Sequence, residues 1–333
     1  MTVALSDAQA MDLAQQAAHL WGARHDAPQP RLIRNRENAV FEIALPGGPA
    51  ALRLHRPGYQ SQGSIASELW WQSALAAEGL AVPTALPTLA GDLVAQLAQG
   101  RLASCIAWAK GDAIGEGGVP LTQSMARQCA LHADLGQMLA EMHTLTDGMT
   151  LPANFTRHRW DLDGLLGETP FWDRFWEHPG LTQHQAAMLQ AARSQLHADF
   201  TSYIARGADI GLIHADVLRE NVLDDDGALT LIDFDDCGIG FRLYDLGTAL
   251  SQNLTEPHLP QIADALISGY SRLRPLSTQD IGLVAGFTLL RTLASVGWTM
   301  SRLPADHPGA RAHIARAVRA SDIVLGGGAL LGR

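Results

Sequence analysis

The hydrophobic period of this 333-residue sequence is mixed in the first hundred residues and mainly helical from Leu121 onward, which restricts the chain to folds with two differently built parts. Between residues 40 and 45, large apolar residues alternate with smaller or polar ones, and the turn Pro-Gly-Gly-Pro then leads into residues 50–55, which predicts a β-hairpin. From Leu121 onward, apolar residues recur at intervals of three and four, the spacing of helices that bury one face. The sequence therefore predicts an α+β protein with a small β-rich part followed by a larger, mainly helical part.

Glycines mark the join between the two parts. Residues 111–120 contain four glycines, which is typical of a linker, so we place the domain boundary after residue 108. The predicted domains are residues 1–108 and 109–333. The clearest periodic segments of the second domain predict helices at 125–145, 182–203 and 259–273.

Further elements follow from local signals. Ser6 and Gln9 form a capping-box pattern ahead of helically spaced apolar residues, which predicts a helix over residues 7–21. The rest of the first domain predicts a helix at 64–78 and strands at 93–97 and 102–108. The apolar run 281–298 is interrupted by Arg291, so we interpret it as a buried helix and not as a membrane span.

Composition excludes several classes of protein. The formal net charge of −10 and the absence of clustered Lys and Arg argue against a general nucleic-acid binder. The three cysteines lie far apart and lack the paired spacing of a zinc site or a disulfide framework. The N-terminal residues have no basic start followed by an apolar run, as a secretory signal would, so we expect a cytoplasmic protein without a membrane anchor.

The segment 211–236, GLIHADVLRENVLDDDGALTLIDFDD, carries the chemistry. Transfer of a phosphoryl group needs a carboxylate to orient the incoming hydroxyl and oxygen ligands that hold magnesium on the polyphosphate. Asp216, Asn221 and Asp233 supply these groups around a predicted hairpin, so we expect them to converge on one side of it. Asp224 to Asp226 are interpreted as an ordinary solvated turn.

The tripeptide His-Ala-Asp is not informative by itself, because it also occurs at 132–134 and 197–199. Five residues after those two aspartates stand Leu139 and Ile204, which cannot bind a metal ion. Only the third copy is followed at that spacing by an asparagine and then by Ile-Asp-Phe. The spacing, and not the tripeptide, therefore indicates the catalytic segment.

This segment resembles the aminoglycoside phosphotransferase and choline kinase superfamily, whose pattern is H-x-D-x-x-x-x-N, then I-D, a glycine pair and D-L. The matching residues are His214, Asp216, Asn221, Asp233, Gly238, Gly240, Asp245 and Leu246. The segments IDFDDCGIG at 232–240 and LGQMLAEMH at 135–143 are similar to the branch that contains the stress-response Ser/Thr kinase and the type II homoserine kinases. The resemblance implies a protein-kinase-like, two-lobed fold.

The resemblance also implies ATP and Mg²⁺ as cofactors, with the nucleotide held by residues 1–108 and catalysis carried out by residues 109–333. Asp216 would orient the acceptor hydroxyl and take its proton, and His214 would brace the loop. Asn221 and Asp233 would bind magnesium. Asp245 would anchor the catalytic loop. Asp235 receives no role.

Four residues of the first domain are implied at the nucleotide. Backbone amides near Asn38 would cover the phosphates, in the loop where protein kinases carry a glycine-rich segment. Arg53 stands where the family usually has a lysine on the α and β phosphates, and Glu68 would pair with it. The backbone at Trp108 would bind adenine; core packing of Trp108 and an exposed helix position for Glu68 are the alternatives.

The acceptor is a small-molecule hydroxyl or the Ser/Thr hydroxyl of a protein. We consider as acceptor-site residues Arg157, His158, Arg159, Trp160, Asp161, Arg291, Trp298 and Arg302, and the basic residues of 157–159 favour an acid-bearing small molecule. A non-catalytic nucleotide-binding regulator is the alternative from a different class, based on Arg53 in the lysine position. A metal-dependent phosphohydrolase would need a second cluster of His and Asp ligands, which the sequence lacks.

Overall fold

The computed structural model describes residues 5–36 and 38–332, and it divides into two compact units. The first unit takes in the described residues of Met1–Asp112 together with Thr150–Arg157 and Leu223–Asp235. The second unit contains Ala113–Met149, His158–Val222 and the described residues from Asp236 onward. The division after residue 108 therefore differs from the structure, because two later segments return to the first unit.

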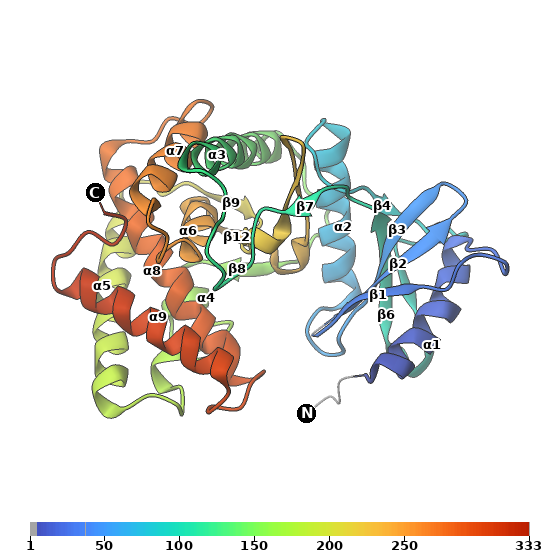
Figure 1. Cartoon of the computed structure of the whole chain (residues 1–333), viewed down its shortest axis with the longest axis horizontal. Coiled ribbons are helices and arrows are strands. Elements are labelled where there is room, and N and C mark those ends of the chain that lie inside the picture. The colour runs from blue at the N-terminus through green and yellow to red at the C-terminus, as the bar shows by residue number, and fades with distance from the viewer. Residues whose placement is uncertain (1–4, 37, 333) are drawn as a thin grey trace. The chain divides into compact units, whose positions relative to one another are not determined.

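The first unit is built on an antiparallel sheet in which the strand order is β1-β2-β3-β6-β4, with β5 also paired to β6 (Figure 1). The strands are β1 (Arg31–Asn35), β2 (Ala39–Leu45), β3 (Gly48–Leu54), β4 (Ala85–Leu86), β5 (Val94–Gln96) and β6 (Leu102–Ala107). Its helices are α1 (Asp7–Ala18) and α2 (Gln62–Ala77). The predicted hairpin, the two helices and the strands at 93–97 and 102–108 are confirmed, while β1 and β4 were not anticipated.

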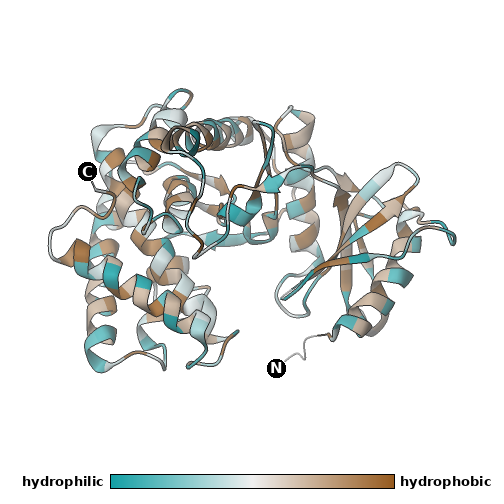
Figure 2. Cartoon of the chain, in the orientation of Figure 1, coloured by the Kyte–Doolittle hydropathy of each residue, from teal (hydrophilic) through white to brown (hydrophobic). Residues whose placement is uncertain are grey.

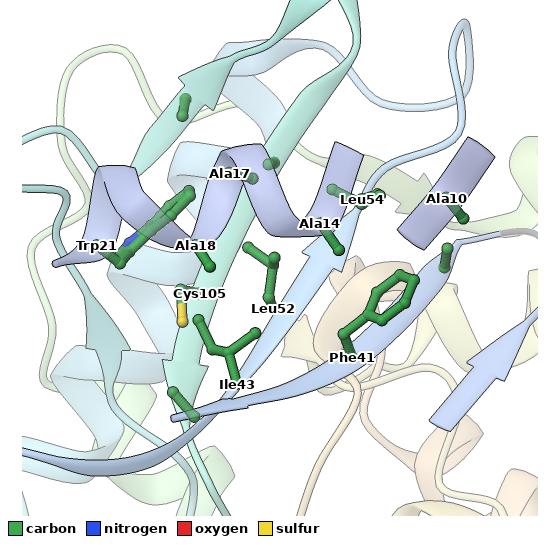
Figure 3. Packing of buried hydrophobic residues seen from close by; sticks show 14 residues of the cluster. Ala10, Ala14, Ala17, Ala18, Trp21, Phe41, Ile43, Leu52, Leu54 and Cys105 are labelled. Atoms are coloured by element: carbon green, nitrogen blue, oxygen red, sulfur yellow. The ribbon is translucent and has the colours of Figure 1, made fainter. Parts of the chain in front are cut away.

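Helix α1 covers one face of this sheet (Figure 3). Its small residues Ala10, Ala14 and Ala17 are buried against apolar side chains of the sheet such as Phe41 and Leu52. The helix begins with the predicted capping box, in which the Ser6 hydroxyl and the Gln9 side chain each bond the other's backbone amide. Because side chains alternate along a strand, Arg53, which follows Leu52 in β3, projects from the sheet face opposite α1.

The second unit is mainly helical. Its helices are α3 (Met125–Asp147), α4 (Leu162–Leu166), α5 (Gln183–Ala205), α6 (Leu243–Ser251), α7 (Leu259–Ser271), α8 (Thr278–Met300) and α9 (Pro308–Leu325). Its small sheet has the order β8 (His158–Trp160), β12 (Gly238–Phe241), β9 (Ile210–Ile213). Strand β12 runs parallel to β8 and antiparallel to β9. A β-carbon at position 238 would meet the His158 carbonyl oxygen at 2.4 Å, so this pairing requires glycine there.

A third, three-stranded sheet has the order β11-β10-β7. Its strands are β11 (Ala228–Leu231), β10 (Val222–Asp225) and β7 (Asp112–Ala113). The predicted turn at Asp224 to Asp226 joins β10 to β11, and the Asp224 carboxylate accepts a hydrogen bond from the Gly227 amide at 2.8 Å. The interpretation of these aspartates as turn residues agrees with this geometry.

Helix α8 is, among the described residues, the helix that is long and apolar enough to cross a membrane. It packs against α6 and α9, and 61% of its most apolar window is buried, so it is a core helix as predicted. Helix α9 was not predicted. Hydrophobic and hydrophilic residues are mixed along α9, whose buried positions are mostly alanines (Figure 2).

Candidate active site

The His-Ala-Asp segment leaves strand β9 and is held by one carboxylate from helix α6. Asp245 Oδ2 accepts a hydrogen bond from the His214 amide at 2.9 Å, and Oδ1 accepts one from the Ala215 amide at 2.7 Å. Ala215 has a φ of 66°, a left-handed conformation that costs an alanine about 1–2 kcal/mol. The two hydrogen bonds to a charged acceptor offset that cost, and the strained turn sets the direction in which Asp216 leaves the loop.

Asp245 is itself positioned by a buried histidine. His143 of α3 donates from Nε2 to Asp245 Oδ2 at 3.1 Å, and its Nδ1 lies 2.9 Å from the Tyr270 hydroxyl of α7. Burial lowers the pKa of His143, so the ring is neutral and Tyr270 donates to Nδ1. Side chains of α3, α6 and α7 thus form one hydrogen-bonded group that holds the backbone at His214 and Ala215.

His214 is fully buried, and its Nδ1 accepts a hydrogen bond from the Asp216 amide at 3.2 Å. This contact matches the bracing role that the family resemblance implies. The loop continues into the short 3-10 helix Arg219–Asn221. Asn221 Nδ2 donates to the Asp216 carbonyl and to Asp216 Oδ2, both at 2.9 Å. The residues five positions apart in the sequence pattern are therefore in direct contact.

The Asp216 carboxylate also has a charged partner, which sequence reasoning did not assign to it. Arg291 of α8 donates from Nη2 to Asp216 Oδ1 at 2.8 Å. The Asp216 side chain keeps 19% of its surface exposed, whereas Arg291 keeps 6%. Burial acts to lower the pKa of Arg291, but Tyr244 and Asp216 raise it overall. The Asp216 carboxylate is therefore oriented by two neighbours and still accessible.

Arg53, on the sheet face opposite α1, connects two carboxylates of the first unit. Its Nη1 donates to Glu68 of α2 at 2.9 Å, and its Nη2 donates to Asp233 at 2.8 Å. Asp235 lies 3.7 Å from the same guanidinium. The predicted Arg53–Glu68 pair is present, and Glu68 is buried and not on an exposed helix face.

Glu68 has a second cationic neighbour besides Arg53. Arg157 Nη1 lies 3.7 Å from Glu68 Oε2, and the Arg157 side chain is fully buried. Burial raises the pKa of Glu68 to about 7, and the two guanidiniums oppose that shift. Arg157 also donates to the Ser64 backbone carbonyl and to the Asp235 carbonyl. Arg157 is therefore a structural residue of the first unit, which corrects its assignment to the acceptor.

Asp235, to which sequence reasoning gave no role, contacts both Asn38 and Arg53. Asn38 Nδ2 donates to Asp235 Oδ2 at 2.9 Å, and Asn38 Oδ1 accepts from the Arg56 amide at 2.9 Å. Burial acts to raise the pKa of Asp235, but Arg53 and the other neighbours lower it overall. The Asn38 side chain thus fastens the loop before β2, so it is not available to a phosphate. Glu37 of the same loop lies outside the described residues.

The remaining predicted residues have ordinary surroundings. Trp108 is half-buried, and its amide donates to the Pro49 carbonyl at 3.3 Å, so that amide is already used. Arg159 is exposed and pairs with Asp161 at 2.7 Å. Trp160 is buried and donates to the Asp236 carbonyl. These contacts give no support to an acid-binding site at residues 157–159.

Comparison with known proteins supports the reading of this geometry. Residues 6–279 match the phosphotransferase enzyme family (APH). A homoserine kinase of Rhizobium etli (strain CIAT 652) is 30% identical over 265 residues, which cover 74% of this chain and 71% of that protein.

Two solved structures share the fold. A microcompartment-associated aminopropanol kinase superposes with a TM-score of 0.81 at 29% identity, covering 96% of this chain and 98% of the other. The amicoumacin kinase hAmiN, in complex with AMP-PNP, Ca²⁺ and Ami, superposes with a TM-score of 0.74 at 18% identity over 98% and 95% of the two chains. The protein-kinase-like α+β fold is thus confirmed. The chain belongs to the phosphotransferase enzyme family and is an ATP-dependent kinase that phosphorylates a hydroxyl group of a small molecule.

Proposed function

We propose that the enzyme transfers the γ-phosphoryl group of Mg²⁺-ATP to the hydroxyl of a small amino alcohol or amino sugar in the cytoplasm, with Asp216 as the residue that orients the hydroxyl and accepts its proton. The observation that carries the proposal is the loop geometry. Asp245 holds the backbone on the N-terminal side of Asp216, and Arg291 and Asn221 hold its carboxylate. An oriented carboxylate next to the acceptor is what in-line transfer to a hydroxyl requires.

The Arg291 pair determines how Asp216 acts. A carboxylate bonded to a buried guanidinium stays ionised and is a weak base. Each carboxylate oxygen has room for a further hydrogen bond, so an acceptor hydroxyl can donate to Asp216 without displacing Arg291. Asp216 then fixes the direction of attack and receives the proton late, as the bond to phosphorus forms.

The residues proposed for magnesium have the donor chemistry that the ion prefers. Asn221 Oδ1 accepts no hydrogen bond within the described part of the chain, and the Asp233 carboxylate is 41% exposed with Arg53 on one oxygen. Mg²⁺ favours hard oxygen ligands and retains several waters. When bound, the ion neutralises charge on the polyphosphate. No group of three or more His, Cys, Asp or Glu that could hold a metal occurs among the described residues, in keeping with an ion shared with a nucleotide.

Arg53 is proposed as the cation at the α and β phosphates. Glu68 and Asp233 hold its two terminal nitrogens in a fixed fork, so its orientation is set before the nucleotide binds. The hydrogen bonds of the Asn38 side chain to Asp235 and Arg56 fasten the loop whose backbone amides would cover the phosphates. Trp108 is retained as a contact for adenine through its ring or carbonyl, since its amide is used.

The experiment is Mg²⁺-dependent ADP release by the purified protein with amino alcohols, amino sugars and a generic protein acceptor. Asp216→Asn should abolish acceptor-stimulated turnover and retain nucleotide binding, whereas Asp233→Ala should weaken Mg²⁺-nucleotide binding as well. Asp226→Asn is the matched control, because it makes the same change at an exposed turn whose left-handed backbone suits asparagine. Wild-type rates in Asp216→Asn would refute the assignment, and stimulation by the protein acceptor alone would move the function to a Ser/Thr protein kinase.

A further inference from the structure

Two charged residues, Arg219 and Glu220, stand between Asp216 and Asn221 in the catalytic loop, and the proposed catalysis uses neither. They begin the short 3-10 helix that ends at Asn221. Asn221 Nδ2 donates to Asp216, so Oδ1 is the atom that remains for the magnesium ion. The direction of Oδ1 depends on how firmly the backbone of this 3-10 helix is held, and this inference rests on the magnesium role proposed for Asn221.

Arg219 forms a buried ion pair inside the second unit. Its Nη2 lies 2.6 Å from Glu256 Oε1, and the two side chains are 2% and 3% exposed. The same guanidinium donates to Asn253 Oδ1 at 2.7 Å and to the Val119 carbonyl at 2.9 Å. Glu256 Oε1 also accepts a hydrogen bond from the Leu121 amide at 3.1 Å. The ion pair therefore fastens the end of the glycine-rich linker to the catalytic loop at two points.

Gln252, at the C-terminal end of α6, connects Arg219 and Glu220 to each other. Its Oε1 accepts a hydrogen bond from the Arg219 amide, and its Nε2 donates to Glu220 Oε2, both at 2.9 Å. The other oxygen of Glu220 accepts a hydrogen bond from the Gly117 amide at 2.8 Å. A backbone amide can only donate here and an ionised carboxylate can only accept, so the Gln252 carboxamide satisfies both neighbours in one orientation only.

The glycine-rich linker lies against these groups, and glycine permits the contact. A β-carbon at Gly117 would lie 2.6 Å from Gln252 Nε2 and 3.2 Å from Glu220 Oε1. Earlier in the linker, the Ile114 amide donates to the Val222 carbonyl at 3.0 Å. The linker is therefore hydrogen-bonded to the catalytic loop both before and after the asparagine, which fixes the backbone that carries the asparagine side chain.

We propose that Glu220 and Gln252 are positioning residues, which hold the 3-10 turn so that Asn221 Oδ1 is oriented to bind magnesium. The buried pair of Arg219 and Glu256 supports the same turn. Residues that orient a metal ligand typically contribute about 10–100-fold to metal affinity or activity. Loss of this orientation should therefore appear both in the affinity for the metal ion and in kcat, since the ion neutralises charge that develops during transfer.

Exchanging the two side chains tests the orientation without changing the net charge. Gln252→Glu places a carboxylate where Glu220 needs a donor, so two like charges face each other. Glu220→Gln leaves a donor opposite a donor at one of the contacts. The double variant Glu220→Gln/Gln252→Glu again pairs a donor with an acceptor at every contact and keeps the net charge of the wild type.

The probe is Mn²⁺, which takes the same kinds of oxygen ligand as Mg²⁺. Its affinity for the enzyme with AMP-PNP is measured from the EPR signal of free Mn²⁺, and kcat from ADP release in saturating Mg²⁺. Each single variant should weaken Mn²⁺ binding about tenfold and lower kcat about tenfold, and the double variant should recover both to within about threefold of the wild type. Binding of AMP-PNP without metal should stay the same in calorimetry.

The controls separate metal positioning from a general effect on the fold. Gln195→Glu makes the same substitution at an exposed position of α5 and should leave Mn²⁺ affinity and kcat unchanged. Asn221→Ala removes the proposed ligand itself. In that background, Gln252→Glu should weaken Mn²⁺ binding no further, because no ligand remains to be oriented. A merely structural role would instead lower Tm and leave the metal affinity of the folded enzyme as it was.

The outcomes separate this proposal from the kinase assignment. Unchanged Mn²⁺ affinity in both single variants, or a loss that the double variant does not recover, refutes the positioning role and leaves the kinase assignment intact. If Asn221→Ala binds Mn²⁺ like the wild type, the magnesium role of Asn221 fails and the positioning role fails with it, whereas Asp216→Asn still tests the kinase. If no acceptor supports turnover, the Mn²⁺ affinities decide alone, and recovery in the double variant supports the positioning role.

Discussion

Replacing Asp245 by asparagine removes one of the two acceptor oxygens that hold the catalytic loop. An amide retains one acceptor, so in its better orientation it keeps the bond to His214 and turns its NH2 group against the Ala215 amide. The loss is one hydrogen bond to a charged group, about 1.5–3 kcal/mol. The strain of Ala215, about 1–2 kcal/mol, is then no longer offset. A loss of about 3 kcal/mol in the stability of the loop corresponds to a roughly hundredfold lower kcat.

The assay is steady-state ADP release with saturating acceptor, together with calorimetric binding of ATP. Nucleotide affinity should change less than threefold, because Arg53 and its partners lie in the other unit. Ala215→Gly, added to Asp245→Asn, should recover about tenfold in kcat, since glycine adopts a positive φ without strain. In the wild-type background the same glycine should change kcat little. An Asp245→Asn enzyme with kcat near wild type, or a double variant no better than the single one, would refute the reasoning.

Three further predictions concern the charged groups. Asp216→Asn should lower kcat about 10²–10⁴-fold with ATP affinity retained, measured by ADP release and calorimetry. Arg53→Lys should keep activity within about tenfold of the wild type, whereas Arg53→Met should lower it at least a hundredfold. Arg53→Met should also destabilise the first unit, because Glu68 loses its nearer cation, and urea unfolding measures this loss of stability. Burial raises the pKa of Glu68 to about 7, so the stability it contributes is present below pH 4.5 and is lost as pH rises through 7. As pH rises from 5 to 8, the free energy of unfolding of the wild type should therefore fall by about 3 kcal/mol relative to that of Glu68→Gln. Urea unfolding measures this difference, and a difference that does not depend on pH would contradict the prediction.

Sequence periodicity predicted the elements that have one clear apolar face. The hairpin of β2 and β3, helix α1 with its capping box and the buried helix α8 were all expected within a few residues. Helix α9 was missed because its buried face consists of small residues such as Ala310 and Ala317, set among charged ones. Small buried residues give a weak hydrophobic signal even where helices pack closely.

The site was predictable where the signal is local in sequence. The contact between Asp216 and Asn221 follows from a fixed spacing of five within one loop. The Arg291 partner lies 75 residues away, and no local pattern indicates such a pair. Asp235 received no role because, in an extended segment, its side chain and that of Asp236 would point in opposite directions. Residues 234–236 form a 3-10 turn instead, which places Asp235 beside Asn38.

Arg53 in the usual lysine position is compatible with a working kinase for a geometric reason. Its two terminal nitrogens reach Glu68 and Asp233 separately, at 2.9 and 2.8 Å. A single ammonium would have to approach both carboxylates with one nitrogen, and the site would then need to contract. Arg157 supplies a second cation to Glu68, so the substitution is built into a network of matched charges. If the lysine had been replaced without compensation, Glu68 would be buried without this network of matched cations. Arg53→Lys is therefore the informative variant, because it tests whether this network has become specific for the guanidinium fork.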